Sequence, residues 1–209
     1  MNKKAIAFGS SSVLLSVSLL AASPALAHHP NGGEIPSNFT QGFLSGIGHP
    51  VIGIDHFVFV VAIGLLAALS KKLGMVIPVA FVVATALGTA IHLQSIDLPL
   101  AELIISASVL MMGIFLAQKK QVNWVIITAV GAIAGIFHGY AYGESIIGAE
   151  TTALGAYLLG FCSIQLVISA IAFYVARSII KTPTSLWLRF AGFTISGIGF
   201  AFVSNAILG

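Results

Sequence analysis

Apolar and polar residues alternate along this chain in long blocks, with hydrophobic runs separated by short polar connections. A first apolar stretch ends near Leu20, and each run after it is about 20 residues long, enough for an α-helix to cross about 30 Å of hydrocarbon. These further runs carry few or no charged residues and cover 49–69, 73–93, 98–117, 122–142, 152–176 and 187–208. The pattern predicts an all-α integral membrane protein whose six helices form one transmembrane bundle.

The composition supports a membrane protein and leaves hardly any room for a soluble domain. Hydrophobic residues make up 58% of the 209 residues and charged residues 7%, whereas soluble domains are about half apolar and a quarter charged. The formal net charge is +3, but the basic residues beyond the first stretch are scattered between the runs, which argues against a nucleic-acid partner. The single cysteine, Cys162, excludes an intrachain disulfide.

Residues 1–27 have the features of a cleaved signal peptide. Lys3 and Lys4 precede the first apolar stretch, and 23–27 supplies the small residues that a signal peptidase requires. We expect cleavage after Ala27, with a retained first membrane helix as the alternative.

Cleavage would start the mature chain at His28 and His29. A free α-amine beside two imidazoles can bind borderline divalent metals, although a polar tail with incidental histidines explains the same residues. The predicted organisation is therefore a signal peptide at 1–27, an external N-terminal segment at 28–48 and a six-span membrane domain at 49–209.

The basic residues predict the orientation of the bundle. If the leader is cleaved, the mature N-terminus is external, and six spans return the C-terminus to the same side of the inner or plasma membrane. Every basic residue of the mature chain then falls at a cytoplasmic helix end, as the positive-inside rule requires. These residues are Lys71, Lys72, Lys119, Lys120, Arg177, Lys181 and Arg189.

The carboxylates and histidines provide an independent observation, because all of those in the mature chain fall in the opposite, outer half. Such a distribution predicts a negatively charged vestibule that concentrates cations. Apart from the two histidines of the tail, these residues are Glu34, Asp55, Asp97, Glu102, Glu144, Glu150, His49, His56, His92 and His138.

The octet HPVIGIDH at 49–56 opens the first run and carries the clearest candidate site. If Pro50 is the first helical residue, Asp55 and His56 lie roughly 8 to 10 Å below the membrane surface at 1.5 Å per residue. Ionisable side chains at that depth usually serve function. His49 and His56 are seven residues apart, so they are expected to project from nearly the same helix face and to address one ion.

Imidazole and carboxylate ligands together favour nickel, cobalt, zinc or copper(II) over magnesium and calcium. Asp55 either binds the metal or orients His56, and Glu102 either binds metal, carries a proton or reaches the interface. For any one histidine, a hydrogen-bonded interfacial role is the alternative. The predicted metal ligands are His49, Asp55, His56, His92 and His138, and the secondary metal or proton candidates are Glu102, Glu144, His28 and His29.

Rows of small residues indicate close helix packing near these candidates. Gly131, Gly135 and Gly139 recur every four residues, and Ala84 and Gly88 precede His92 at the same spacing. Such rows permit close backbone approach in membranes, either around a histidine site or as ordinary packing. Gly197 and Gly199 in the last run carry little information.

The histidine-rich mature terminus, the octet HPVIGIDH and the segment FHGYAYGE at 137–144 together resemble the HupE/UreJ family. Members are membrane permeases associated with nickel, sometimes cobalt, and their genes often accompany hydrogenase or urease systems. The resemblance implies a signature site at His49, Asp55 and His56, to which His138 and Glu144 contribute. Many relatives have a second histidine where this chain has Tyr142. That departure bears on metal preference and coordination number.

The sequence thus predicts a transporter and not an enzyme: secondary uptake of Ni²⁺ or Co²⁺, with the transported ion and no other cofactor. A metalloenzyme maturation system is the expected partner. The chain has no GxxxxGK phosphate-binding loop. The alternatives are an intramembrane zinc-dependent hydrolase with Asp55 or Glu102 as general base, a haem-binding electron carrier using His92 and His138, and a non-transporting membrane partner in hydrogenase maturation.

Overall fold

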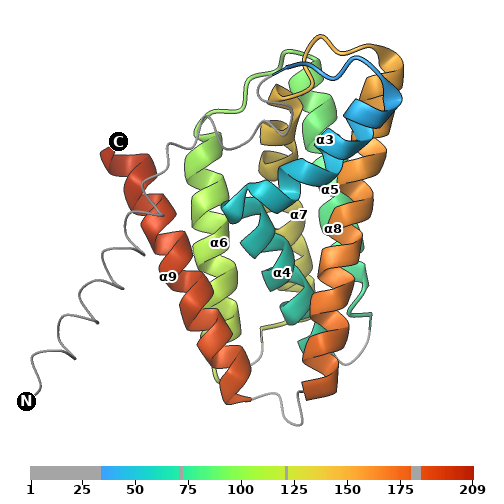
Figure 1. The fold of residues 1–209 in the computed structure, drawn as a ribbon. Helices are drawn as coiled ribbons and strands as arrows, with labels where there is room; N and C mark the ends of the chain where they lie inside the picture. Colours follow the sequence, from blue (N-terminus) through green and yellow to red (C-terminus); the bar gives the residue numbers. More distant parts are fainter. Residues whose placement is uncertain (1–33, 71–72, 121, 180–184) are drawn as a thin grey trace, which may run out of the picture.

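The computed structural model describes residues 34–70, 73–120, 122–179 and 185–209, and this part of the chain folds as a bundle of α-helices (Figure 1). The predicted signal peptide, together with His28 and His29, lies outside the described residues. The helices are α3 (Phe39–Ile52), α4 (Ile54–Leu69), α5 (Val76–Leu93), α6 (Ala101–Ala117), α7 (Trp124–Glu144), α8 (Thr151–Ile179) and α9 (Leu186–Leu208). The predicted all-α class is confirmed.

Four of these helices, α5, α7, α8 and α9, are each long and apolar enough to cross a membrane. The pair α3 and α4 meets the same criterion only when its two halves are taken together, and α6 is a shorter apolar helix of 17 residues. By length and composition, the described residues therefore contain four or five candidate spans rather than six uniform ones.

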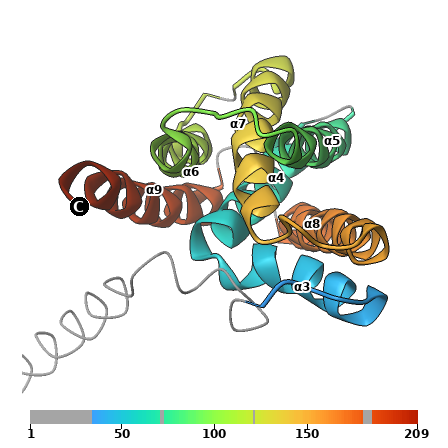
Figure 2. The same cartoon turned by 90° about the horizontal axis from the view of Figure 1, so that it is seen from above.

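The prediction of one continuous helix over 49–69 is wrong. The chain is bent by 79° between α3 and α4 (Figures 1 and 2). Gly53 has extended backbone angles, φ −68° and ψ 104°, so it interrupts the helical hydrogen-bond ladder. Pro50 is not the first helical residue but lies inside α3, where its ring supplies no N–H. Consequently α3 runs obliquely across the bundle, and α4 begins where α3 ends, near the middle of the bundle.

Glycines set the closest helix contacts. A Cβ atom at Gly139 of α7 would overlap the Thr85 carbonyl oxygen of α5. A Cβ atom at Gly88 of α5 would likewise overlap the Ile136 carbonyl oxygen of α7. Gly135 and Gly139 of one small-residue row therefore pack against the row of Ala84 and Gly88 at the α5/α7 interface, whereas Gly131 faces Ile63 of α4 and Met112 of α6. Gly199, which carried little information in the sequence, likewise lies against the backbone of Leu110 in α6.

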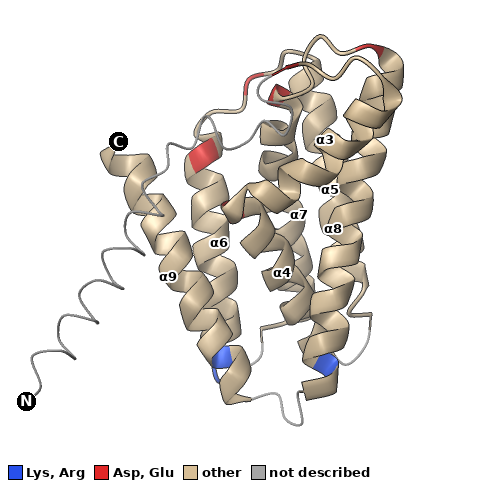
Figure 3. Cartoon of the chain, in the orientation of Figure 1, with Lys and Arg blue, Asp and Glu red and all other residues tan. Residues whose placement is uncertain are grey.

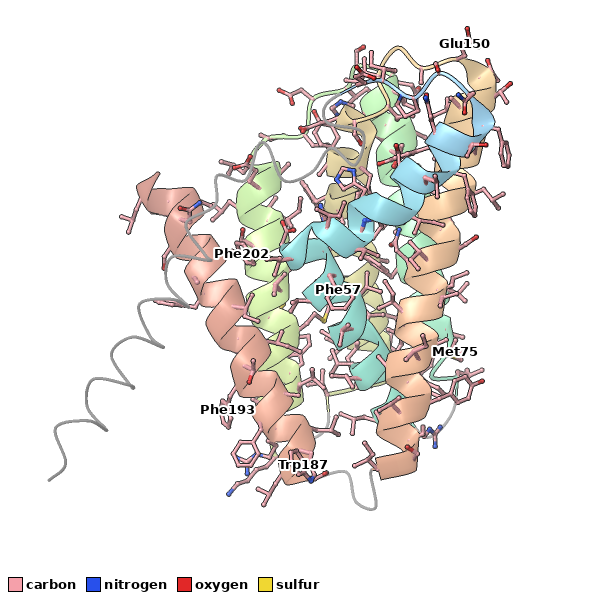
Figure 4. The ribbon with its side chains drawn as sticks, viewed as in Figure 1. Phe57, Met75, Glu150, Trp187, Phe193 and Phe202 are labelled. Atoms are coloured by element: carbon pink, nitrogen blue, oxygen red, sulfur yellow. The ribbon has the colours of Figure 1, made fainter. Side chains whose placement is uncertain are left out.

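The outer surface is apolar, and the polar groups of the bundle are partly inside. Trp187 and Phe193 of α9 are 74% and 56% exposed, and Phe57 also faces outward (Figure 4). In contrast, the buried side chains include three histidines, Gln165 and several hydroxyl residues. This distribution is expected of a bundle that contacts lipid, because lipid favours apolar side chains and polar groups require internal partners.

Apart from Asp55, which lies in the first turn of α4, the described charged residues are divided between the two ends of the bundle (Figure 3). One end, here called the acidic end, carries Glu34, Asp97, Glu102, Glu144 and Glu150; the opposite, basic end carries the described basic residues Lys119, Lys120, Arg177 and Arg189. The C-terminus of α9 lies at the acidic end.

Replacing Gly139 by alanine should lower the stability of the bundle by about 1–3 kcal/mol, because the added methyl group overpacks the α5/α7 contact. The matched control is Gly197→Ala in α9, since no atom lies within 4 Å of a Cβ there. Alanine should stabilise that helical position slightly. Thermal unfolding in detergent should show a lower melting temperature for Gly139→Ala and a slightly higher one for Gly197→Ala. Equal shifts in melting temperature would contradict the close contact.

Candidate metal site

Three histidines from three helices converge in the interior of the bundle. His49 of α3, His56 of α4 and His138 of α7 are each no more than 2% exposed. The ring centroids of His49 and His56 are 5.7 Å apart, and those of His56 and His138 are 4.8 Å apart. The site is therefore built from elements far apart in the sequence, and His56 lies between the other two rings.

His49 and His56 lie together for a different reason from the one predicted. They do not share the face of one helix, because the chain turns at Gly53 and places them on two helices. A Cβ at Gly53 would lie 2.8 Å from His56 Cδ2 and 3.3 Å from the His49 carbonyl oxygen. Glycine at the bend thus leaves space for the His56 ring against the end of α3.

The shortest contact in the site joins His56 and His138. Their Nδ1 atoms are 2.7 Å apart. The other ring nitrogen of His138, Nε2, lies 3.1 Å from the hydroxyl oxygen of Ser108 in α6. His138 is thus held at both nitrogens by groups from two neighbouring helices.

His49 is held by hydroxyl groups. Its Nδ1 lies 2.9 Å from Ser145 Oγ and 3.0 Å from the hydroxyl oxygen of Tyr157 in α8. Both hydroxyls also donate to the carbonyl oxygen of Tyr142, Tyr157 at 2.9 Å and Ser145 at 3.1 Å. This network connects α3, α7 and α8, and it fixes the ring plane of His49 within the site.

Aromatic rings surround the histidines. The Tyr142 ring centroid lies 4.9 Å from that of His49 and 4.6 Å from that of His56. Phe59 lies 4.4 Å from His138 by the same measure. The Tyr142 hydroxyl is buried and makes no hydrogen bond with any described residue. Such rings lower the local polarity, which strengthens any interaction between the imidazoles and a cation.

Asp55 lies in the first turn of α4, beside the histidines. Its Oδ1 atom accepts a hydrogen bond of 2.8 Å from the backbone N–H of His56. A carboxylate at this position also interacts favourably with the positive end of the helix dipole. Asp55 therefore stabilises the start of α4 after the bend and supplies negative charge next to the imidazoles.

The remaining candidates lie elsewhere. His92 of α5 packs on the ring of Tyr140, with centroids 4.3 Å apart, and the Tyr140 hydroxyl donates to Asp97 over 3.0 Å. Tyr140 is two residues from His138, so the two side chains project from nearly opposite sides of α7. His92 thus belongs to a separate cluster. Glu102 and Glu144 are exposed at the acidic end.

The described residues do not contain a finished metal-binding group. Across 34–70, 73–120, 122–179 and 185–209, no three His, Cys, Asp or Glu side chains are grouped closely enough to hold an ion together. The pair His56 and His138 has the geometry closest to that of two metal ligands, since its two Nδ1 atoms already face one point.

Sequence reasoning missed the hydroxyl partners. Ser108, Ser145 and Tyr157 bond the histidines from positions 30 to 108 residues away along the chain. Ser145 and Tyr157, which also contact each other, are 12 residues apart. Tyrosines near a helix end, as in FHGYAYGE, commonly form an interfacial aromatic belt, but Tyr140 and Tyr142 are buried. The four-residue spacing of His138 and Tyr142 was the available signal, because it places both side chains on one helix face.

Comparison with known proteins agrees with the resemblance noted in the sequence. The family described as "HupE / UreJ protein" matches residues 15–202. Protein HupE of Rhizobium leguminosarum bv. viciae is 28% identical over 181 residues, which cover 86% of this chain and 91% of the relative. No solved structure matches the chain.

Replacing Tyr157 by phenylalanine should lower stability by about 1–3 kcal/mol, because His49, Ser145 and the Tyr142 carbonyl lose a buried partner. Tyr174→Phe is the control on the same helix, since that side chain is 66% exposed and its loss should change stability by less than about 0.5 kcal/mol. Melting temperatures in detergent check the difference, and an unchanged Tyr157→Phe protein would contradict the network.

Proposed function

Because this chain belongs to the HupE/UreJ family of membrane transporters, we propose that it takes up a divalent transition-metal cation, Ni²⁺ or Co²⁺, by secondary transport. The observation that carries the proposal is the convergence of His49, His56 and His138 in the bundle interior. Neutral imidazole is a preferred ligand for these metals. In this proposal the metal supplies a maturation system for a metalloenzyme such as hydrogenase or urease.

The histidine pair can accept a metal after a small movement. Metal–nitrogen bonds of about 2.0–2.1 Å in a tetrahedral site place two nitrogens about 3.3 Å apart. The Nδ1 atoms of His56 and His138 are 2.7 Å apart, so the rings need to separate by less than about 1 Å. The hydrogen shared by these two nitrogens also has to leave before both can bind the ion. His49 and Asp55 adjoin the pair and are the proposed further ligands, which complete the site as the ion enters.

We propose six crossings, with α3 and α4 forming one broken crossing and α5 to α9 forming five. Transporters commonly build substrate sites where a membrane helix is discontinuous, and Gly53 is such a point. The basic end is assigned to the cytoplasm by the positive-inside rule. The acidic end, which includes the C-terminus, is then external and offers incoming cations a negative surface (Figure 3).

This orientation places the histidines in the outer half of the membrane. His56 is thirteen residues from the basic end of α4 at Leu69, and His138 is fourteen residues from the start of α7 at Trp124. At 1.5 Å per residue, both lie about 20 Å above the cytoplasmic helix ends, in a hydrocarbon layer about 30 Å thick. An ion that reaches them still has most of the membrane to cross.

A cavity of about 380 Å³ at the basic end suggests the release side. It opens between α4, α6 and α7, the same three helices that hold the His56–His138 pair, and Leu66, Phe115 and Ile127 contribute to its lining. Between cavity and histidines, a Cβ at Gly131 would lie 3.1 Å from Ile63 Cδ1 and 4.0 Å from Met112 Cε. We propose that this apolar contact closes the inner path and that helix rocking opens it.

Uptake of radiolabelled Ni²⁺ or Co²⁺ into proteoliposomes tests the function. The intact protein should accumulate metal, whereas His56→Ala, His138→Ala and Asp55→Ala should each lose uptake by at least about 10-fold, as expected when a ligand or its partner is removed. His92→Ala is the matched control, because His92 lies in a separate cluster at the acidic end. Equal uptake by wild type and His56→Ala would refute the site.

An inside-negative membrane potential should drive the uptake. Moving a divalent cation inward across 100 mV releases about 4.6 kcal/mol, twice the value for a single charge. A potassium gradient with valinomycin should therefore raise the accumulated metal well above the level in vesicles without a potential. Accumulation that is insensitive to the potential would contradict movement of a net positive charge.

A further inference from the structure

His138 has a different polar partner at each ring nitrogen. Its Nδ1 faces Nδ1 of His56 at 2.7 Å, and its Nε2 faces the hydroxyl oxygen of Ser108 at 3.1 Å. All three side chains are buried, Ser108 being 4% exposed. Because a neutral imidazole carries one N–H and one lone pair, the Ser108 contact decides which nitrogen keeps the lone pair.

The hydroxyl hydrogen of Ser108 is already committed. Ser108 Oγ donates to the carbonyl oxygen of Ile105, one turn earlier in α6, over 2.6 Å. Its oxygen can therefore act only as an acceptor toward His138, so the hydrogen of that contact belongs to Nε2 of the histidine. The lone pair of neutral His138 is then on Nδ1, the atom that faces His56.

We infer that Ser108 is a positioning residue of the transport site, which fixes the His138 tautomer and ring orientation so that Nδ1 receives the metal. This inference rests on the proposed metal transport and adds a residue that the sequence did not single out. Ser108 itself does not touch the ion, because its oxygen lies at the far side of the imidazole ring. Partners of this kind typically change metal affinity 10- to 100-fold.

The tautomer can be measured without any metal. Protein labelled with ¹⁵N-histidine and reconstituted in nanodiscs gives long-range ¹H–¹⁵N correlations that distinguish Nδ1–H from Nε2–H, and the His138→Ala spectrum assigns the signal. Wild-type His138 should be protonated at Nε2. A signal from the Nδ1–H form in the wild type would overturn the inference before any serine variant is made.

Variants then test the role of the hydroxyl. In Ser108→Ala, the fixed Nε2–H pattern should be lost and the KM for Ni²⁺ uptake should rise about 10- to 100-fold, with the maximal rate largely retained. Ser108→Thr keeps a hydroxyl and should restore both readouts. Ser106→Ala is the matched control, because Ser106 is also buried in α6 but projects about 200° around the helix from Ser108.

The two possible failures are distinguishable. If Ser108→Ala keeps the wild-type tautomer and KM while His138→Ala abolishes uptake, the positioning role is refuted and the transport function stands. If the wild type takes up no metal, the proposed function fails, and with it the role of Ser108 in transport. Loss of uptake in Ser106→Ala equal to that in Ser108→Ala would assign the effect to α6 packing and would also refute the positioning role.

Discussion

A buried imidazole in a lipid-contacting bundle is stabilised by hydrogen-bond partners, because an unpaired polar group in this environment costs several kcal/mol. The architecture around the three histidines follows from that constraint. Ser108 reaches His138 from α6, while Ser145 and Tyr157 reach His49 from the end of α7 and from α8. These polar contacts specify how five helices are arranged around one point, which nonspecific apolar packing alone would not determine.

Glycine makes that arrangement sterically possible. Gly139 and Gly88 bring α5 and α7 into backbone contact next to His138, and Gly46 does the same for α3 against the Tyr157 carbonyl in α8. The small residues and the site are therefore coupled, since the hydroxyl of Tyr157 reaches His49 only when α3 and α8 are this close. Tyr157 takes part in both, because its carbonyl packs against Gly46 and its hydroxyl bonds His49.

The sequence predicted the apolar helices well but not the interruption between α3 and α4. Run length alone located α7 and α9 to within about two residues, because a membrane crossing demands a minimum apolar length. The break at Gly53 left no trace in hydrophobicity, since both halves are apolar, and Pro50 was interpreted as a helix start. Convergence of the octet with His138 was expected, whereas the serine and tyrosine partners come from distant positions that a single sequence does not pair.

The bend at Gly53 also divides the histidines between two helices that can move separately. His49 belongs to α3 and His56 to α4, while His56 and His138 are in direct contact between α4 and α7. A swing of α3 about the bend would thus remove one nitrogen donor and leave the other two in place. In the proposed metal site, the number of nitrogen donors would then depend on the angle between α3 and α4, so a change in that angle would change the affinity for the ion.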